Sequence, residues 1–331
     1  MTKTGTVRIG ISGWTYAPWR GVFYPKELAQ KQELAYAARH FASIEINGTF
    51  YGLQKPDSFA RWSGETPDDF VFAVKGSRYI THMRKLREIE TPLANFMASG
   101  PLRLGRKLGP ILWQFPPRLA FDPALFEPFL ALLPQNMEAA AELARRHDNR
   151  LEGRSWTECE VEGPLRHAIE IRHDSFRSPE FIELLRHYKV ALVCADTVEW
   201  PRLMDLTSDF VYCRLHGSEE LYVSGYDDDA LDLWARRVDA WAQGREPAEA
   251  ERVLEPARTR SKGRDVYVYF DNDVKVRAPA DAKALAERLG IALDSEKQQM
   301  QSRNSSRRRR STRPAARGTA SPGVQAPRQS S

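Results

Sequence analysis

The sequence predicts an α/β protein: a single (β/α)8 barrel of the TIM type, followed by a disordered basic tail. Three observations lead to this prediction. Eight short β-branched or aromatic runs recur between Val7 and Phe270. Segments with helical spacing of apolar residues lie between most of them, and alternating strands and helices are typical of a parallel sheet. The chain has 331 residues, which suits one barrel as a single domain. We place the barrel at residues 7–290 and the tail at residues 291–331.

The expected strands are mostly continuous apolar runs rather than strict alternations of apolar and polar residues. Parallel strands that are covered on both faces have this composition. The eight runs are Val7–Ile11, Ala42–Ile46, Phe70–Val74, Gly109–Gln114, His167–Ile171, Val190–Ala195, Phe210–Leu215 and Val266–Phe270.

Helices are expected where apolar residues recur at steps of three and four. Leu231, Trp234, Val238 and Trp241 form one such stripe in the segment Asp229–Gln243. The last expected helix has Pro near its start and Gly directly after its end, which are both boundary signals. The other expected helices are Glu27–His40, Pro123–Leu133, Pro179–His187 and Pro279–Leu289.

Two long insertions, Arg145–Arg166 and Gln243–Arg264, each lead into a strand. In a parallel barrel such segments lie at the N-terminal end, away from the usual active site. We therefore expect both insertions to be structural or to contact partners.

The net charge of +5 at pH 7 is concentrated in the tail. Residues 291–331 hold nine Lys and Arg against two acidic residues, which leaves 40 basic and 42 acidic residues in the rest of the chain. The tail is rich in Ser, Gln, Pro, Gly and Arg, so we expect disorder. The run Arg307–Arg310 is a possible contact for nucleic acid or acidic partners, of a non-specific and salt-sensitive kind.

No apolar stretch has the length of a signal peptide or of a membrane span, which needs about 20 residues. We therefore expect a cytoplasmic protein without membrane contact. The three cysteines, Cys159, Cys194 and Cys213, lack CxxC spacing. Neither a disulfide framework nor a structural zinc site is indicated.

Polar side chains cluster where the expected strands end. Barrel enzymes build their sites from the C-terminal ends of the strands, so the ring is the expected place for ligand binding, and its members other than His173 and Asp271 are expected to converge on one concave pocket. The members of this ring are Glu45, Asn47, Lys75, Gln114, Glu170, Arg172, His173, Asp196, Arg214, His216, Asp271 and Asn272.

The ring combines carboxylates with cations, which favours an enzyme of hydrolase or lyase type with a small anionic substrate bearing phosphate or carboxylate. Glu45 and Glu170 are the candidate general acid and base, and His216 and Asp196 are further catalytic candidates. The expected substrate-binding residues are Asn47, Tyr51, Lys75, His82, Gln114, Arg172, His173, Arg214 and Asn272.

Alternatives remain open on the sequence alone. The ring residues could form only barrel-end salt bridges, or the barrel could bind a metabolite or nucleic acid without catalysis. A zinc or manganese site is conceivable, but no HxH or HExxH motif is present and the neighbouring cations would repel a metal ion. We assign no metal ligand and no particular cofactor.

Several motifs resemble one known family, domain-of-unknown-function family 72, the YecE-like proteins. The resemblance covers about residues 10–289 and implies a barrel fold, but no substrate, cofactor or reaction. Gly48 and Asp271 depart mildly from the family pattern, where Ser and Asn are common. The motifs are Gly10-Ile-Ser-Gly-Trp14 with Tyr16 and Trp19, Phe23-Tyr-Pro25, Glu45-Ile-Asn-Gly-Thr-Phe-Tyr51, Phe72-Ala-Val-Lys75, Ile80-Thr-His82, Leu108-Gly-Pro-Ile-Leu-Trp-Gln-Phe-Pro-Pro117, Glu170-Ile-Arg-His173, Arg214-Leu-His-Gly217 and Tyr269-Phe-Asp-Asn272.

Overall fold

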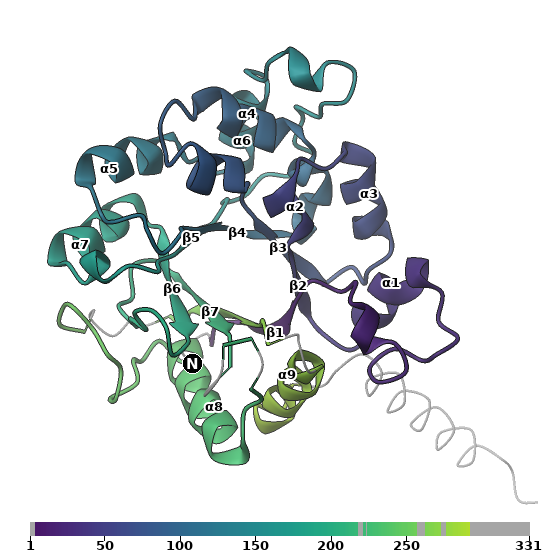
Figure 1. Ribbon diagram of the computed structural model, residues 1–331, viewed down its shortest axis with the longest axis vertical. Coiled ribbons are helices and arrows are strands. Elements are labelled where there is room, and N and C mark those ends of the chain that lie inside the picture. Colours follow the sequence, from purple (N-terminus) through teal and green to yellow (C-terminus); the bar gives the residue numbers. More distant parts are fainter. Residues whose placement is uncertain (1–3, 218–220, 223, 257–261, 273–275, 292–331) are drawn as a thin grey trace, which may run out of the picture. The chain divides into compact units, whose positions relative to one another are not determined.

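The structure, a computed structural model, describes residues 4–217, 221–222, 224–256, 262–272 and 276–291. At its centre the parallel strands β1 to β8 close into a barrel in chain order, with β1 hydrogen-bonded to β8 (Figure 1). The (β/α)8 prediction is confirmed, and every predicted strand boundary lies within one residue of the observed one. The strands are β1 Val7–Ser12, β2 Ser43–Ile46, β3 Val71–Lys75, β4 Leu108–Gln114, β5 His167–Glu170, β6 Ala191–Asp196, β7 Phe210–Leu215 and β8 Asp265–Phe270.

Helices surround the ring of strands (Figure 1). The predicted helix Glu27–His40 is shorter than expected, since a 3-10 turn at Gln30–Gln32 precedes α1. The first residues of that segment carry only one large apolar side chain, Leu28, so they have no stripe to bury. The α-helices are α1 Glu33–Ala37, α2 Gly48–Tyr51, α3 Pro56–Gly64, α4 Glu90–Ala98, α5 Pro123–Leu132, α6 Met137–Ala144, α7 Pro179–Tyr188, α8 Asp228–Ala242 and α9 Arg277–Arg288.

The lumen of the barrel is filled by side chains of unequal size. Tyr212, Tyr267 and Tyr269 belong to the inner cluster and come from β7 and β8. The small residues Ala73 on β3 and Ala168 on β5 belong to the same cluster. Large rings from one side therefore occupy the space that alanines leave on the other, and the lumen is a packed core.

The connection from β6 to β7, residues 197–209, contains no helix. Asp205 in this loop is buried, and its carboxylate accepts hydrogen bonds from the main-chain nitrogens of Val253 and Leu254 at 2.9 Å each. Both donors belong to the insertion Gln243–Arg264. The insertion thus packs against the loop that replaces a helix, which supports its structural role.

The insertion Arg145–Arg166 packs against the end of α4. Its Asp148 nitrogen donates to Asn95 Oδ1 at 3.0 Å, and its Trp156 nitrogen donates to the Ala98 carbonyl at 2.8 Å. These contacts also favour the structural interpretation.

Within the described residues, no helix is long and apolar enough to cross a membrane. Cys159, Cys194 and Cys213 are free thiols. Apart from Ile291, the predicted tail with its run Arg307–Arg310 lies outside the described residues, so its disorder stays a prediction.

Close contact between β1 and β2 depends on Gly10. A β-carbon at this position would lie 1.8 Å from the Ser43 carbonyl oxygen, so the backbones would have to separate. We predict that Gly10→Ala lowers the free energy of unfolding by about 3 kcal/mol, at the upper end of overpacking effects. Gly52→Ala is the control, because nothing lies within 4 Å of its β-carbon position. Urea unfolding measures both variants, and equal effects would contradict the close approach.

Candidate active site at the C-terminal end of the barrel

Arg214, on β7, is fully buried and binds three carboxylates. Its Nη1 donates to Glu170 at 2.6 Å and its Nη2 to Asp271 at 2.7 Å. Nη2 also donates to Glu45 at 2.9 Å, and Nε donates to the same carboxylate at 3.1 Å. Every nitrogen of the guanidinium is therefore engaged. The site formed by this arrangement and its neighbours is called the mouth cluster, and its members are Glu45, Glu170, Arg172, Arg214, His216 and Asp271.

Two hydroxyl groups complete the surroundings of Glu45, which is fully buried on β2. Ser12 donates to Oε1 at 2.7 Å and Tyr212 donates to Oε2 at 2.6 Å. Burial, followed by the Glu45 charge, raises the pKa of Tyr212 well above its usual value, so the phenol keeps its proton. Both oxygens of Glu45 are thus held by donors of the protein itself.

Glu170, at the end of β5, lies between two arginines. Its Oε1 accepts from Arg172 Nε at 2.8 Å, while Oε2 accepts from Arg214. Burial alone would raise the pKa of Glu170, but Arg214 and then Arg172 hold it well below the usual range. Glu170 is therefore ionised at neutral pH and is a weak proton acceptor.

Arg172 forms one wall of the site together with two aromatic side chains. Its guanidinium carbon lies 4.0 Å from the centre of the Trp200 ring, and its Nη2 donates to the Tyr222 hydroxyl at 3.1 Å. The rings of Trp200 and Tyr222 also pack edge-on against His216. This wall is built by segments that follow β5, β6 and β7.

His216 is fully buried beside two acidic groups. Its Nδ1 lies 3.1 Å from Asp271 Oδ2 and its Nε2 lies 3.6 Å from Glu170 Oε2. Neither ring nitrogen makes a hydrogen bond in the described part of the chain. Burial would raise the pKa of Asp271, but Arg214 and then the close His216 ring lower it to about 2.

Lys75, at the end of β3, is 8% exposed and is placed differently from the arginines. Its Nζ lies 4.6 Å from the centre of the Phe50 ring. Within the described residues its ammonium has no hydrogen bond or ion pair. Burial and then Arg214 lower the pKa of Lys75 to about 8, against the opposing charges of Glu45, Asp271 and Glu170.

His82 lies near the same rim, in the π-helical turn η3 Tyr79–Met83. Its ring packs edge-on against Phe50, and its Nδ1 lies 2.8 Å from Thr81 Oγ1. Burial, followed by Arg172 and Lys75, lowers the pKa of His82 to about 4. The ring is therefore neutral at pH 7, and the rim around it is electropositive.

Most of the expected ring converges as predicted. Gln114 is also buried, and its position two residues after the inward-facing Leu112 directs it to the same end. The converging residues are Glu45, Lys75, Gln114, Glu170, Arg172, Arg214 and His216.

Asp196 and Asn272 do not join them. Asp196 accepts from Trp234 Nε1 on α8 at 3.1 Å and pairs with Arg202 at 2.9 Å. Asn272 donates to Asp281 on α9 at 2.8 Å. The expectation that they enter the same pocket is wrong, because successive strand residues alternate between lumen and helices, and these two face the helices.

Three further residues lie at the margin. His173 caps the turn that follows β5, and its Nδ1 accepts from the Ser175 nitrogen at 3.2 Å. Asn47 follows β2 and precedes α2, and its Oδ1 is buried without a hydrogen bond in the described part of the chain. Tyr51 is 68% exposed, and Arg78 lies 5.4 Å from the centre of its ring. None of the three bonds directly to the mouth cluster within the described residues.

Sequence reasoning ranked Asp271 below Asn272 and did not select Tyr212 or Trp200. The alternation of side chains along a strand identifies Asp271 and Tyr212 as inward-facing. Asp271 lies two residues after the inward Tyr269, and Tyr212 lies two residues before Arg214. Trp200 lies in a loop and has no such signal.

The arrangement offers a buried set of paired charges and one unpaired ammonium. In the described ranges, no three His, Cys, Asp or Glu side chains are placed to hold a metal ion. The histidine and carboxylate side chains of the expected ring do not all meet, because His173 and Asp196 lie outside the mouth cluster. Proton transfer and anion binding are the chemistry that the site supports.

The fold and the site together define a (β/α)8 barrel protein with a buried ionic cluster at the C-terminal end. A family model described as protein of unknown function DUF72 matches residues 8–305, so the chain belongs to this family, as the motifs indicated. Similar curated proteins are UPF0759 protein YunF of Bacillus subtilis, 31% identical over 116 residues, and UPF0759 protein YecE of Escherichia coli K12, 32% identical over 125 residues. The alignments span 34% and 33% of this chain, and 40% and 43% of those proteins.

Two solved structures are similar over most of the chain. A DUF72 family protein from Thermotoga maritima has a TM-score of 0.62 at 24% identity, covering 86% of this chain and 99% of that chain. A DUF72 family protein from Enterococcus faecalis has a TM-score of 0.63 at 17% identity, covering 87% and 96%. These similarities support the fold.

Removing the guanidinium of Arg214 leaves three carboxylates facing one another. We predict that Arg214→Gln lowers the free energy of unfolding by about 3–5 kcal/mol, the cost of breaking a buried ion pair on one side. Arg177→Gln is the matched control, since Arg177 forms partly exposed pairs and should cost less than about 1 kcal/mol. Chemical denaturation measures both, and a small effect at Arg214 would contradict its structural role.

The pKa of Asp271 also predicts a pH dependence of stability. Its pKa is lower when folded, about 2, than its usual 3.8. The contribution is therefore complete above about pH 4 and is lost as the pH falls towards 2. Asp271→Asn should be about 2 kcal/mol less stable at pH 7, and the difference should shrink towards pH 2. Urea unfolding of the parent and of Asp271→Asn between pH 7 and pH 2 measures this difference, and Glu127→Gln is the exposed control. A difference in stability that stays constant with pH would argue against the pairing of Asp271 with Arg214.

Proposed function

We propose that the mouth cluster and Lys75 form the active site of an enzyme of hydrolase or lyase type. Its substrate is a small anion that carries phosphate or carboxylate, and Lys75 is the group that binds the anion and transfers the proton. A barrel enzyme of this kind uses the C-terminal ends of its strands for substrate binding, which is where these residues lie.

The observation that carries the proposal is the unpaired ammonium of Lys75. It is 8% exposed and lies over the Phe50 ring, while the neighbouring carboxylates are already bonded to arginines. A buried lysine without a carboxylate partner is costly unless it serves a ligand. An incoming phosphate or carboxylate would supply the missing partner.

The other residues take roles that differ from those expected from sequence. Each guanidinium nitrogen of Arg214 already donates to a carboxylate. Arg214 therefore orients Glu45 and Glu170 and does not bind the substrate. Glu170, ionised and doubly paired, keeps Arg172 in place instead of acting as the general acid. Arg172 presents its remaining N–H groups and its Trp200 wall to the substrate.

Lys75 can serve at either step of a proton transfer. Because its pKa is about 8, both the ammonium and the amine are present near neutral pH. The ammonium can give its proton to a leaving oxygen, and the amine can then take a proton from water or from carbon. Arg172 stabilises negative charge that develops on the substrate beside it.

Replacing Lys75 tests this role. Activity on a panel of phosphoesters and sugar acids, with and without Mn²⁺ or Zn²⁺, should fall by about 10²–10⁴ in kcat for Lys75→Met, the usual range for a lost general acid or base. Lys283→Met on the surface of α9 is the matched control. The pH profile of the parent protein should show a group with a pKa of about 8.

Turnover that is equal in Lys75→Met and the parent would remove Lys75 from the mechanism. The competing function is a barrel that binds a metabolite or nucleic acid without catalysis, for which the Arg307–Arg310 run in the sequence offers electrostatic attraction. Binding of a panel member that requires Lys75 but gives no product would favour that alternative.

A further inference from the structure

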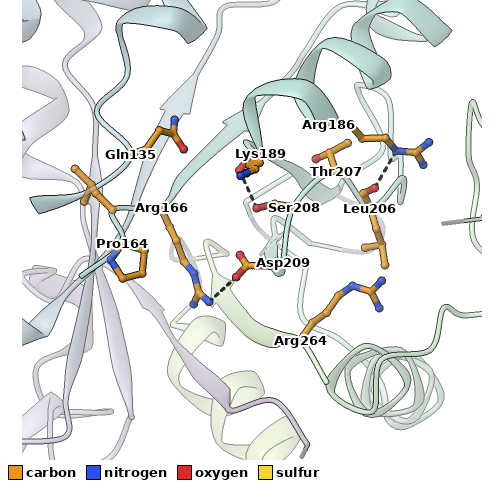
Figure 2. Close-up of a pocket in the computed structure, with 11 residues that line it drawn as sticks. Gln135, Pro164, Arg166, Arg186, Lys189, Leu206, Thr207, Ser208, Asp209 and Arg264 are labelled. Carbon is orange, nitrogen blue, oxygen red and sulfur yellow. Dashed lines mark hydrogen bonds and ion pairs between the residues drawn. The ribbon is translucent and has the colours of Figure 1, made fainter. Parts of the chain in front are cut away.

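A second concave site lies at the opposite end of the barrel, where the strands begin. A cavity of about 700 Å³ is lined there by residues that directly precede β5, β6, β7 and β8, together with the end of α7 (Figure 2). We call it the base cavity. Its lining residues are Gln135, Pro164, Leu165, Arg166, Arg186, Lys189, Leu206, Thr207, Ser208, Asp209 and Arg264.

Positive charge dominates this lining. Four basic side chains surround the base cavity, and Asp209 is the acidic residue of the lining. Figure 2 shows Arg166 on the side of Pro164, with Arg186 and Arg264 on the opposite side. A concave surface of one charge concentrates ions of the other sign.

Some of the donors in this lining have no partner among the described residues. Arg186 uses Nε for the Leu206 carbonyl at 3.2 Å, but its buried Nη2 makes no hydrogen bond. Arg166 binds Asp265 at 2.7 Å and Asp209 at 3.3 Å, yet its buried Nε is also unbonded. Such buried unpaired groups destabilise the folded protein unless a ligand or water satisfies them.

Helix geometry explains only part of this charge. The helices of the barrel end at this side, and basic residues commonly pair with their last carbonyls. Arg264 does so, with Nη1 donating to the Gly244 carbonyl at 3.0 Å. Lys189 does not, because its ammonium makes no hydrogen bond or ion pair among the described residues, and only its main-chain oxygen accepts a hydrogen bond, from the Ser208 hydroxyl at 2.8 Å.

We propose that the base cavity binds a small phosphate-bearing anion, at a site separate from the mouth cluster. The volume lies within the range of small-molecule sites, about 300–1,000 Å³. Arg186 and Lys189 bind the phosphate oxygens. Pro164, Leu165 and Leu206 contact the apolar part of the ligand. Arginine and lysine donors from several directions suit phosphate, which offers more oxygens than carboxylate.

Calorimetric titration of the full chain with sodium pyrophosphate and with ADP tests the proposal. Salt of about 0.15 M limits long-range attraction to about 8 Å. The double variant R186Q/K189Q should bind at least about tenfold more weakly than the parent, because charge-assisted bonds are lost. The matched control R236Q/K283Q removes the same charge from exposed positions of α8 and α9 and should bind like the parent.

Two further variants separate the possible sites. Lys75→Met changes the other end of the barrel and should leave this binding intact. A variant with Gln at all four positions of Arg307–Arg310 lacks the basic run and should also bind the probes like the parent. Binding that is lost in either of these variants but kept in R186Q/K189Q would overturn the proposal. No saturable binding of either probe by about 1 mM would overturn it as well.

Discussion

The guanidinium of Arg214 is the interaction on which the C-terminal end of the barrel depends. It joins carboxylates from β2, β5 and the segment after β8, so strands that are far apart in sequence meet at one buried cation. When two carboxylates are buried near each other, each ordinarily raises the pKa of the other, and one of them takes up a proton. Arg214 opposes this, since it lowers the pKa of Glu170 and of Asp271 against the effect of burial, and both stay ionised at neutral pH.

This neutralisation changes how the remaining groups behave. Burial and then the charge of Arg214 lower the pKa of the Lys75 ammonium, against the opposing carboxylates that Arg214 already binds. Burial, followed by the charges of Arg172 and Lys75, lowers the pKa of His82 and keeps its ring neutral. Lys75 and His82, whose pKa values are both lowered, therefore lie at the rim, while the carboxylates and arginines below them are held in ion pairs.

Much of the fold was predictable from the sequence, since strands buried on both faces leave continuous apolar runs. The position of the site was also predictable, because strand ends carry the polar residues. The direction in which a single side chain points was harder to predict. Asp196 and Asn272 were expected in the pocket, yet each faces a helix, because a shift of one residue reverses the side-chain direction. The sharing of Arg214 by three acids depends on barrel closure, which no local pattern encodes.

The tyrosines of the lumen separate the two ends of the molecule. Tyr267, near the start of β8, stacks with Tyr212, whose hydroxyl reaches Glu45, and the rings leave the interior packed rather than hollow. The packed interior offers no passage between the two ends, although both face the same solvent. A ligand held at one end therefore does not touch the groups at the other, and either end can change its side chains without changing the contacts of the other.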